Sequence, residues 1–161
     1  MKSAELTVVI VSYNTVALTL RAIETLYAQT FQTKFDCIVF DNASGDGSAD
    51  AIAAQYPQVT LIRSPENVGF ARANNIAVTQ SKTPYILLLN PDTETQAGAI
   101  DALMRCAGDC PEAGIWGGRT VFADGTLNLA SCWAAPSLRG LLCRAVGLST
   151  LLPWSSFANP E

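Results

Sequence analysis

The sequence predicts an α/β fold: a mainly parallel sheet with helices on both faces. Over the first 110 or so residues, short apolar runs rich in β-branched residues alternate with segments whose apolar residues recur at helical spacing. The first run, LTVVIVS at 6–12, is apolar almost throughout, as expected for a strand that is covered on both faces. Strands that alternate with helices are joined by right-handed crossovers, and such crossovers make the sheet parallel.

Strand and helix follow each other four times. The helix after the first strand has an apolar face formed by Leu20, Ile23, Leu26 and Tyr27. Ser48 is placed to cap the N-terminus of the helix after the second strand, which ends at Asp41. In chain order, we expect strands at 6–12, 35–40, 59–63 and 85–89, and helices at 16–29, 48–56, 69–80 and 97–107.

The alternating pattern ends near Gly114. Two extended runs joined at Asp124-Gly125 then predict a β-hairpin. We therefore expect a first part at 1–125 and a second part at 126–161, with a hairpin strand and an amphipathic segment. In residues 136–157 of this second part, leucines recur at near-helical spacing with two arginines beside them. This segment is expected either to pack on a further half of the domain or to rest on a membrane surface.

Composition excludes several classes of function. The chain has 161 residues, 49% of them hydrophobic and 15% charged, and a net charge of −4. We expect a buried core and no nucleic-acid partner, because phosphate binding needs clustered Lys and Arg. No apolar run reaches the roughly 18 residues that predict a membrane span. The N-terminus lacks the apolar core of a signal peptide, so the five cysteines are expected to be reduced thiols of a cytoplasmic protein.

The chain contains no histidine. Nucleophilic Ser-His-Asp or Cys-His arrangements and His-ligated metals are therefore excluded within these residues. Acid–base chemistry and metal binding must fall to Asp and Glu, whose hard oxygen atoms suit Mg²⁺ or Mn²⁺.

Polar residues follow three of the predicted strands: Ser12-Tyr13-Asn14, Asp41-Asn42 and Asn90-Pro91-Asp92. In an open α/β sheet, ligands bind at the carboxyl ends of the strands. Each of these segments alone is typical of an ordinary turn, but three at one edge of a sheet predict a binding site. A dinucleotide site and an ATP-hydrolysing site are not expected, because neither G-x-G-x-x-G nor a Walker loop is present.

Four segments carry, in order and spacing, a resemblance to a known family: VVIVSYN at 8–14, VFDNASGDGS at 39–48, ENVGFARANN at 66–75 and LLLNPDTE at 87–94. Over about residues 5–125 the chain resembles family 2 glycosyltransferases, in particular the bacterial rhamnosyltransferase-like branch, which often has N-P-D in place of D-x-D. The resemblance implies a GT-A fold whose donor-binding part lies at 1–125. It also implies inverting transfer of a sugar, with rhamnose as a candidate. The donor would be a nucleotide diphosphate, and the acceptor a cell-surface glycan or a lipid-linked molecule at the inner face of the cytoplasmic membrane.

The resemblance further implies a set of nucleotide-binding residues. These are Val11, Ser12, Tyr13, Asp41, Asn67, Gly69, Asn75 and Asn90. The first three would hold the nucleobase, and Asp41 would accept a hydrogen bond from the ring N–H of uracil or thymine, which implies UDP or dTDP. Many relatives have Arg-Asn where this chain has Asn74-Asn75, so no arginine stands at the matching position.

Asp92 is the metal ligand that the resemblance implies. It would bind Mg²⁺ or Mn²⁺ bridging the diphosphate, and the cation would offset charge on the leaving nucleotide. Pro91 fixes the backbone just before it. N-P-D carries one negative charge fewer than D-x-D, so weaker metal affinity is expected, with Glu94 as a secondary candidate ligand.

Inverting transfer also needs a general base. Family members have it beyond the hairpin, but the only acidic residues after Glu112 are Asp124, in the expected turn, and Glu161. The catalytic base is therefore unassigned, and we expect the donor half of a longer enzyme, inactive alone and lacking the acceptor half. Two alternatives are a non-catalytic nucleotide-sugar-binding protein and a sugar nucleotidyltransferase. The latter class has a Gly-rich first loop with a basic residue, where this chain has Ser-Tyr-Asn-Thr.

Overall fold

The computed structural model describes residues 3–128, 131, 142–143, 145–147, 151 and 155. The chain divides into two compact units, residues 1–116 and 117–161. Among the residues described, none of the helices combines the length and the apolar character that crossing a membrane requires. Most of the expected amphipathic segment at 136–157 lies outside the described residues, so its expected role stays a prediction.

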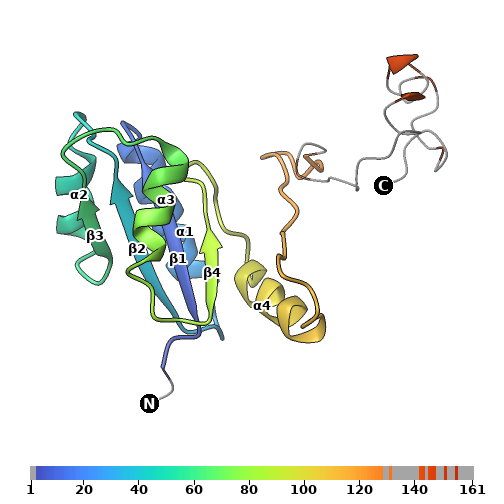
Figure 1. The fold of residues 1–161 in the computed structure, drawn as a ribbon, viewed down its shortest axis with the longest axis horizontal. Helices are drawn as coiled ribbons and strands as arrows, with labels where there is room; N and C mark the ends of the chain where they lie inside the picture. Colours follow the sequence, from blue (N-terminus) through green and yellow to red (C-terminus); the bar gives the residue numbers. More distant parts are fainter. Residues whose placement is uncertain are drawn as a thin grey trace. The chain divides into compact units, whose positions relative to one another are not determined.

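A four-stranded parallel sheet forms the centre of the first unit (Figure 1). Its strands are β1 (Leu6–Ser12), β2 (Phe35–Asp41), β3 (Thr60–Arg63) and β4 (Tyr85–Leu88), in the order β3-β2-β1-β4. Helices α1 (Val16–Gln29), α2 (Ser48–Gln55) and α3 (Phe70–Val78) connect successive strands, and α4 (Ala99–Asp109) follows β4. The predicted α/β class with a parallel sheet is confirmed.

The apolar run at 6–12 becomes the inner strand β1, and all seven of its residues are buried. Its pairing with β2 extends from Leu6 opposite Phe35 to Ser12 opposite Asp41. On its other side β1 pairs with β4 over Leu6 to Val9. A strand with neighbours on both sides and helices on both faces has no solvent-facing side, which explains why the run does not alternate with polar residues.

Helices cover both faces of this sheet, as predicted. On one face, Val8 and Ile10 of β1 pack with Ile23 of α1 and Ile52 of α2, and Ile100 of α4 belongs to the same cluster. On the other face, Val9, Val11, Ile38 and Phe40 pack against Ala73 and Ala77 of α3, the helix that crosses the sheet in Figure 1.

One local prediction needs correction. Ser48 does not cap α2: the N-cap is Gly47, at φ +83°, and Ser48 is the first, buried residue of the helix. Glycine adopts this left-handed backbone conformation without the steric cost that serine would meet. In the second unit, Val121 and Leu127 form an antiparallel bridge across the predicted turn at Asp124-Gly125, and the Phe122 N–H donates to the Thr126 carbonyl and the Asn128 N–H to the Thr120 carbonyl, at 2.8 and 2.9 Å.

Asp101 of α4 ties that helix to the loop between α1 and β2. The residue is only 4% exposed. One carboxylate oxygen accepts a hydrogen bond from the Phe31 N–H at 2.9 Å, and the other accepts from Gln32 and Thr33 at 3.1 and 2.8 Å. Burial by itself raises the pKa of this carboxyl, but the backbone donors favour the charged form more strongly, so the pKa falls to about 2.

This lowered pKa predicts a contribution to stability that depends on pH. Because the folded-state pKa lies below the ordinary value of 3.8, the ionised carboxylate stabilises the fold above about pH 4, and the contribution is lost as pH falls toward 2. Asp101→Asn should lower the free energy of unfolding at pH 7 by about 2 kcal/mol, a deficit that should shrink below pH 4. Urea unfolding across this pH range measures it. Asp109→Asn, at the exposed end of α4, is the matched control, and an equal loss in both variants would contradict the assignment.

Candidate functional site

Parallel pairing brings the carboxyl ends of the strands to one edge of the sheet. Ser12 lies opposite Asp41, and Asp41 lies opposite Arg63, the last residue of β3. The backbone beyond the strands continues this alignment, since the Asn42 N–H donates to the Ser12 carbonyl and the Ser64 N–H to the Asp41 carbonyl, at 2.8 and 2.9 Å. Residues from distant parts of the sequence therefore meet at this edge.

Asp41 is a buried carboxylate with one unused oxygen. The residue is 4% exposed at the end of β2. Its Oδ2 accepts a hydrogen bond from the Ser44 N–H at 3.2 Å, whereas its Oδ1 is buried and has no hydrogen-bond partner among the described residues. A buried acceptor without a donor costs free energy, so a ligand N–H at this oxygen would remove an existing penalty.

The segment after Asp41 is held against the segment after β1. The Asn14 N–H donates to the Ser44 hydroxyl at 3.0 Å, and the Gly45 N–H donates to the Asn14 side-chain oxygen at 2.8 Å. Asn14 and Ala43 both have positive φ, 52° and 64°. Asparagine tolerates this conformation, but for alanine it is uncommon and strained, and such strain tends to occur at functional sites.

Asp46 reinforces this connection at the start of two helices. Its Oδ2 accepts from the Val16 N–H at 3.0 Å, the first residue of α1, and its Oδ1 accepts from the Ser48 N–H at 3.0 Å, the first residue of α2. The Ser48 hydroxyl is the strongest of several donors that lower the pKa of this exposed carboxyl. A single side chain thus satisfies an unpaired N–H at each helix N-terminus and joins the two loops.

A cavity of about 530 Å³ lies beside these loops. Its lining residues are Asp41, Ala43, Ser44, Gly45, Gly47, Ala49, Asp50, Arg63, Ser64 and Pro65. Its volume falls within the range of small-molecule sites. On its rim, the Arg63 guanidinium donates to Asp50 at 2.7 Å and to the Ala49 carbonyl at 3.3 Å.

The loop after β4 is anchored to α1. The Leu89 N–H donates to the Val9 carbonyl at 2.9 Å, after which the Thr93 N–H donates to the Asn90 carbonyl at 3.2 Å and closes a turn with Pro91 at its second position. This turn leaves Asn90 and Asp92 exposed.

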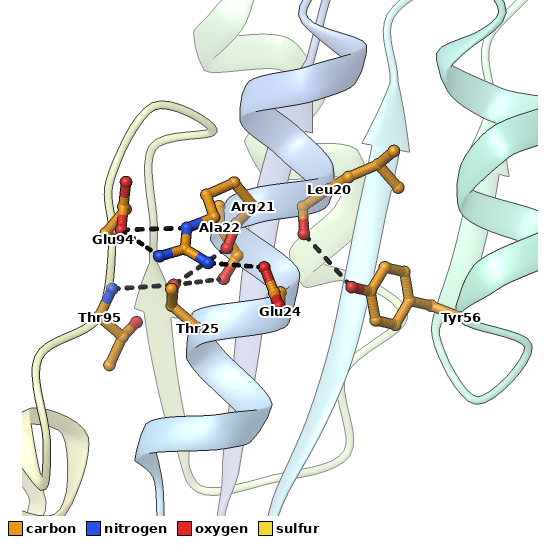
Figure 2. A network of polar contacts seen from close by, with 8 residues as sticks. All are labelled: Leu20, Arg21, Ala22, Glu24, Thr25, Tyr56, Glu94 and Thr95. Atoms are coloured by element: carbon orange, nitrogen blue, oxygen red, sulfur yellow. Dashed lines mark hydrogen bonds and ion pairs between the residues drawn. The ribbon is translucent and has the colours of Figure 1, made fainter.

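Two contacts hold the far side of this loop (Figure 2). The Arg21 side chain bonds one oxygen of Glu94 at 3.0 and 3.1 Å, and the Thr95 N–H donates to the Thr25 hydroxyl at 3.0 Å. Glu94, the secondary candidate ligand, is therefore engaged in an ion pair. The described residues contain no cluster of three or more Cys, Asp or Glu side chains that would bind a metal by itself.

The other sequence-predicted residues differ in how they meet this edge. Tyr13 is 48% exposed just beyond β1, whereas Val11 packs under α3. The Ser12 hydroxyl is buried against α1, 2.9 Å from the Thr19 hydroxyl, so this side chain supports the edge from beneath.

Asn67, Gly69 and Asn75 belong to the segment that enters α3. The Asn67 side-chain oxygen accepts from the Asn42 amide and from the Gly69 N–H, both at 2.9 Å, which ties this segment to the residue after Asp41. Gly69 is the N-cap at φ 82° and ψ 161°, a conformation restricted to glycine. Asn75 is exposed, two positions from the buried Ala73 and therefore on another side of α3, so the described contacts do not bring it to Asp41.

Sequence reasoning missed part of the cavity wall. Arg63, Ser64 and Pro65 follow β3 directly, so the rule that strand ends form the site would have included them had it been applied to all four strands. The two contacts of Asp46 could not be predicted from the sequence, because both partners are backbone N–H groups. One belongs to Val16, about 30 positions away, and the other to Ser48, two positions away.

Similarity to known proteins agrees with this geometry. The sequence profile described as Glycosyl transferase family 2 matches residues 7–150. The N-acetylglucosaminyl-diphospho-decaprenol L-rhamnosyltransferase of Mycobacterium tuberculosis is 28% identical over 136 residues, which cover 77% of this chain and 44% of that protein. The teichoic acid poly(glycerol phosphate) polymerase of Staphylococcus epidermidis is 31% identical over 100 residues, which cover 60% of this chain and 14% of that protein. The chain thus spans less than half the length of these relatives.

Solved structures show the same fold. The mannosyltransferase PcManGT of Pyrobaculum calidifontis, in complex with GDP-Man and Mn²⁺, has a TM-score of 0.61 and 25% identity, covering 65% of this chain and 32% of that one. A structure of S. aureus TarS in complex with UDP has a TM-score of 0.59 and 17% identity, with the same coverage of both chains. The predicted GT-A fold is confirmed, and because the family profile matches most of the sequence, this chain belongs to glycosyl transferase family 2.

Proposed function

We propose that this chain binds the nucleotide-diphosphate donor of a sugar transferase, with the cavity beside Asp41 as the nucleobase site. The observation that carries the proposal is the unused, buried Oδ1 of Asp41. Because this carboxylate can only accept hydrogen bonds when ionised, it selects a base that offers an N–H on its ring. Uracil and thymine have such a group at N3, whereas the corresponding ring nitrogen of adenine is an acceptor.

The remaining oxygen of Asp41 favours a pyrimidine. Oδ2 already accepts the Ser44 N–H, so one acceptor position is left for one ring donor. Guanine would bring a ring N–H and an adjacent amino group, which together match two free oxygens. UDP or dTDP is therefore the preferred form of the donor nucleotide. Oδ1 is covered in this structure, so the proposal requires the residues around it to move when the base binds.

The loop after β4 also fits a divalent cation that Asp92 and the phosphates of the donor would bind together. Asp92 is an exposed carboxylate, and Mg²⁺ and Mn²⁺ take one or two protein carboxylates together with phosphate oxygens and water. The cation supplies positive charge that stabilises the leaving diphosphate. PcManGT, which was solved with GDP-Man and Mn²⁺, supports the use of such a cation by this fold. The Arg21–Glu94 pair contributes by holding the loop that carries Asp92.

The reaction we propose for the whole protein is transfer of a sugar to a glycan or a lipid-linked acceptor at the cytoplasmic face of the membrane. The similarity to a rhamnosyltransferase named for a decaprenol-linked substrate supports a lipid-linked acceptor and makes rhamnose the first sugar to test. Asn90, exposed beside Asp92, is proposed to bind a ribose hydroxyl, with Tyr13 packing near the base.

Nucleotide binding tests the base site. In calorimetry with the 161-residue chain, UDP and dTDP should bind and ADP should not. Asp41→Asn should weaken UDP binding by about tenfold or more, because the amide can still accept from Ser44 but turns a donor toward the base. Asp36→Asn, at the exposed other end of β2, serves as control. Equal affinities for the three nucleotides, or an unaffected Asp41→Asn variant, would refute the base-reading role.

A second experiment tests the cation site. Mn²⁺ should tighten UDP binding, because Asp92 would hold a cation whose charge attracts the diphosphate, and Asp92→Asn should abolish this gain. Affinity for uridine, which has no phosphates, should stay unchanged in the variant. Asp109→Asn removes the same charge from α4 and should retain the Mn²⁺ effect. If Asp92→Asn retained it as well, the ligand would have to be another residue.

A further inference from the structure

The Arg63 side chain lies next to Asp41 on the same face of the sheet. The two residues are register partners at the carboxyl ends of β2 and β3. Side chains alternate along a strand, and Val39 and Leu61, two residues earlier in each strand, both contribute to the cluster covered by α1 and α2. Asp41 and Arg63 therefore project toward this same side, and both line the cavity.

The start of α2 orients the Arg63 guanidinium. Nη1 donates to Asp50 at 2.7 Å and Nη2 donates to the Ala49 carbonyl at 3.3 Å, which uses two of the five N–H groups of the side chain. The ion pair is solvent-exposed, with side-chain exposures of 51% for Arg63 and 84% for Asp50. Exposed pairs of this kind stabilise a fold by at most about 1 kcal/mol. The small contribution of this ion pair to stability therefore does little to explain why the Arg63 guanidinium is held in a fixed orientation at the rim of the cavity.

The hydrogen-bonding groups of the bases suggest which ligand atom the Arg63 guanidinium binds. In uracil and thymine the ring N3–H stands between two carbonyl oxygens, O2 and O4, so the edge presents a donor with an acceptor on each side. Asp41 offers an acceptor and Arg63 offers donors at neighbouring positions of the cavity wall. Cytosine shares O2 with uracil but has a ring acceptor at N3 and an amino group at C4, so with Arg63 facing position 4 it would meet repulsion at both residues.

We propose that Arg63 is a second base-reading residue, whose guanidinium donates to O4, the carbonyl oxygen that stands next to the N3–H bound by Asp41 and that cytosine replaces with an amino group. Asp50 is its positioning residue and holds the guanidinium at the rim. This inference rests on the proposed base site and adds to it the exclusion of cytosine nucleotides.

The test measures affinities of UDP, CDP and uridine for the 161-residue chain and for Arg63→Ala, by calorimetry for the nucleotides and NMR titration for uridine. Loss of one hydrogen bond from a charged group should weaken UDP and uridine alike, by about tenfold. CDP should be the weaker ligand of the unaltered chain and should be little affected, so the ratio of UDP to CDP affinity falls. Arg105→Ala, on the exposed side of α4, is the matched control for charge and should change none of these affinities.

Two outcomes would overturn the inference while leaving the base site intact, provided that UDP binding still depends on Asp41. The first is an unchanged UDP to CDP ratio in Arg63→Ala. The second is a loss confined to UDP and absent for uridine, which would assign Arg63 to the diphosphate. A chain that binds no UDP at all would overturn the proposed function itself. Thermal unfolding by circular dichroism should give nearly the same midpoint for Arg63→Ala as for the unaltered chain.

Discussion

The structure of the first unit depends on the burial of β1 between two strands and two layers of helices. All seven residues of this strand are buried, and its backbone groups pair with β2 and β4. Because the pairing is parallel, the direction of β1 sets the direction of its neighbours, and their carboxyl ends meet at one edge. This parallel pairing places three distant parts of the sequence at the same edge: Asp41, Arg63 and the loop that carries Asp92.

Side-chain hydrogen bonds and one ion pair hold the loops in place at this edge, beside the cavity. Asn14 and Asp46 join the segment after β1 to the segment after β2, and Asn67 joins the entry of α3 to Asn42. Arg21 performs the corresponding task for the loop after β4. Each contact is modest in energy when taken alone, but together they restrict loops that would otherwise have many conformations, and a restricted loop loses less entropy when a ligand binds.

Among the residues that the structure describes, one acceptor at this edge, Asp41 Oδ1, has no donor. Most buried polar groups of a folded protein are hydrogen-bonded, and the Oδ1 atom of Asp41 departs from this rule beside a strained residue, Ala43, and an oriented cation, Arg63. A nucleobase that brings an N–H and a carbonyl would complete the pattern. Asp41 and Arg63 then provide both affinity and selectivity. A base with an acceptor at N3 and a donor at position 4 would leave the buried carboxylate of Asp41 unpaired and would place its amino group against the guanidinium of Arg63.

The sequence by itself determined the α/β class and all four strands and four helices of the first unit to within a few residues, and it predicted the edge where the candidate site lies. It could do so because burial on two faces and helical periodicity are local patterns of apolar residues. The family resemblance carried the nucleotide-binding candidates, among which Asp41 proved to have an unused oxygen. Only the tertiary structure decided that Gly47 and not Ser48 caps α2, that Glu94 pairs with Arg21, and that Asp46 joins two helix starts. It also decided that Arg63 stands beside Asp41. These features depend on backbone conformation and on contacts between residues distant in the chain, and neither leaves a periodic pattern in the sequence.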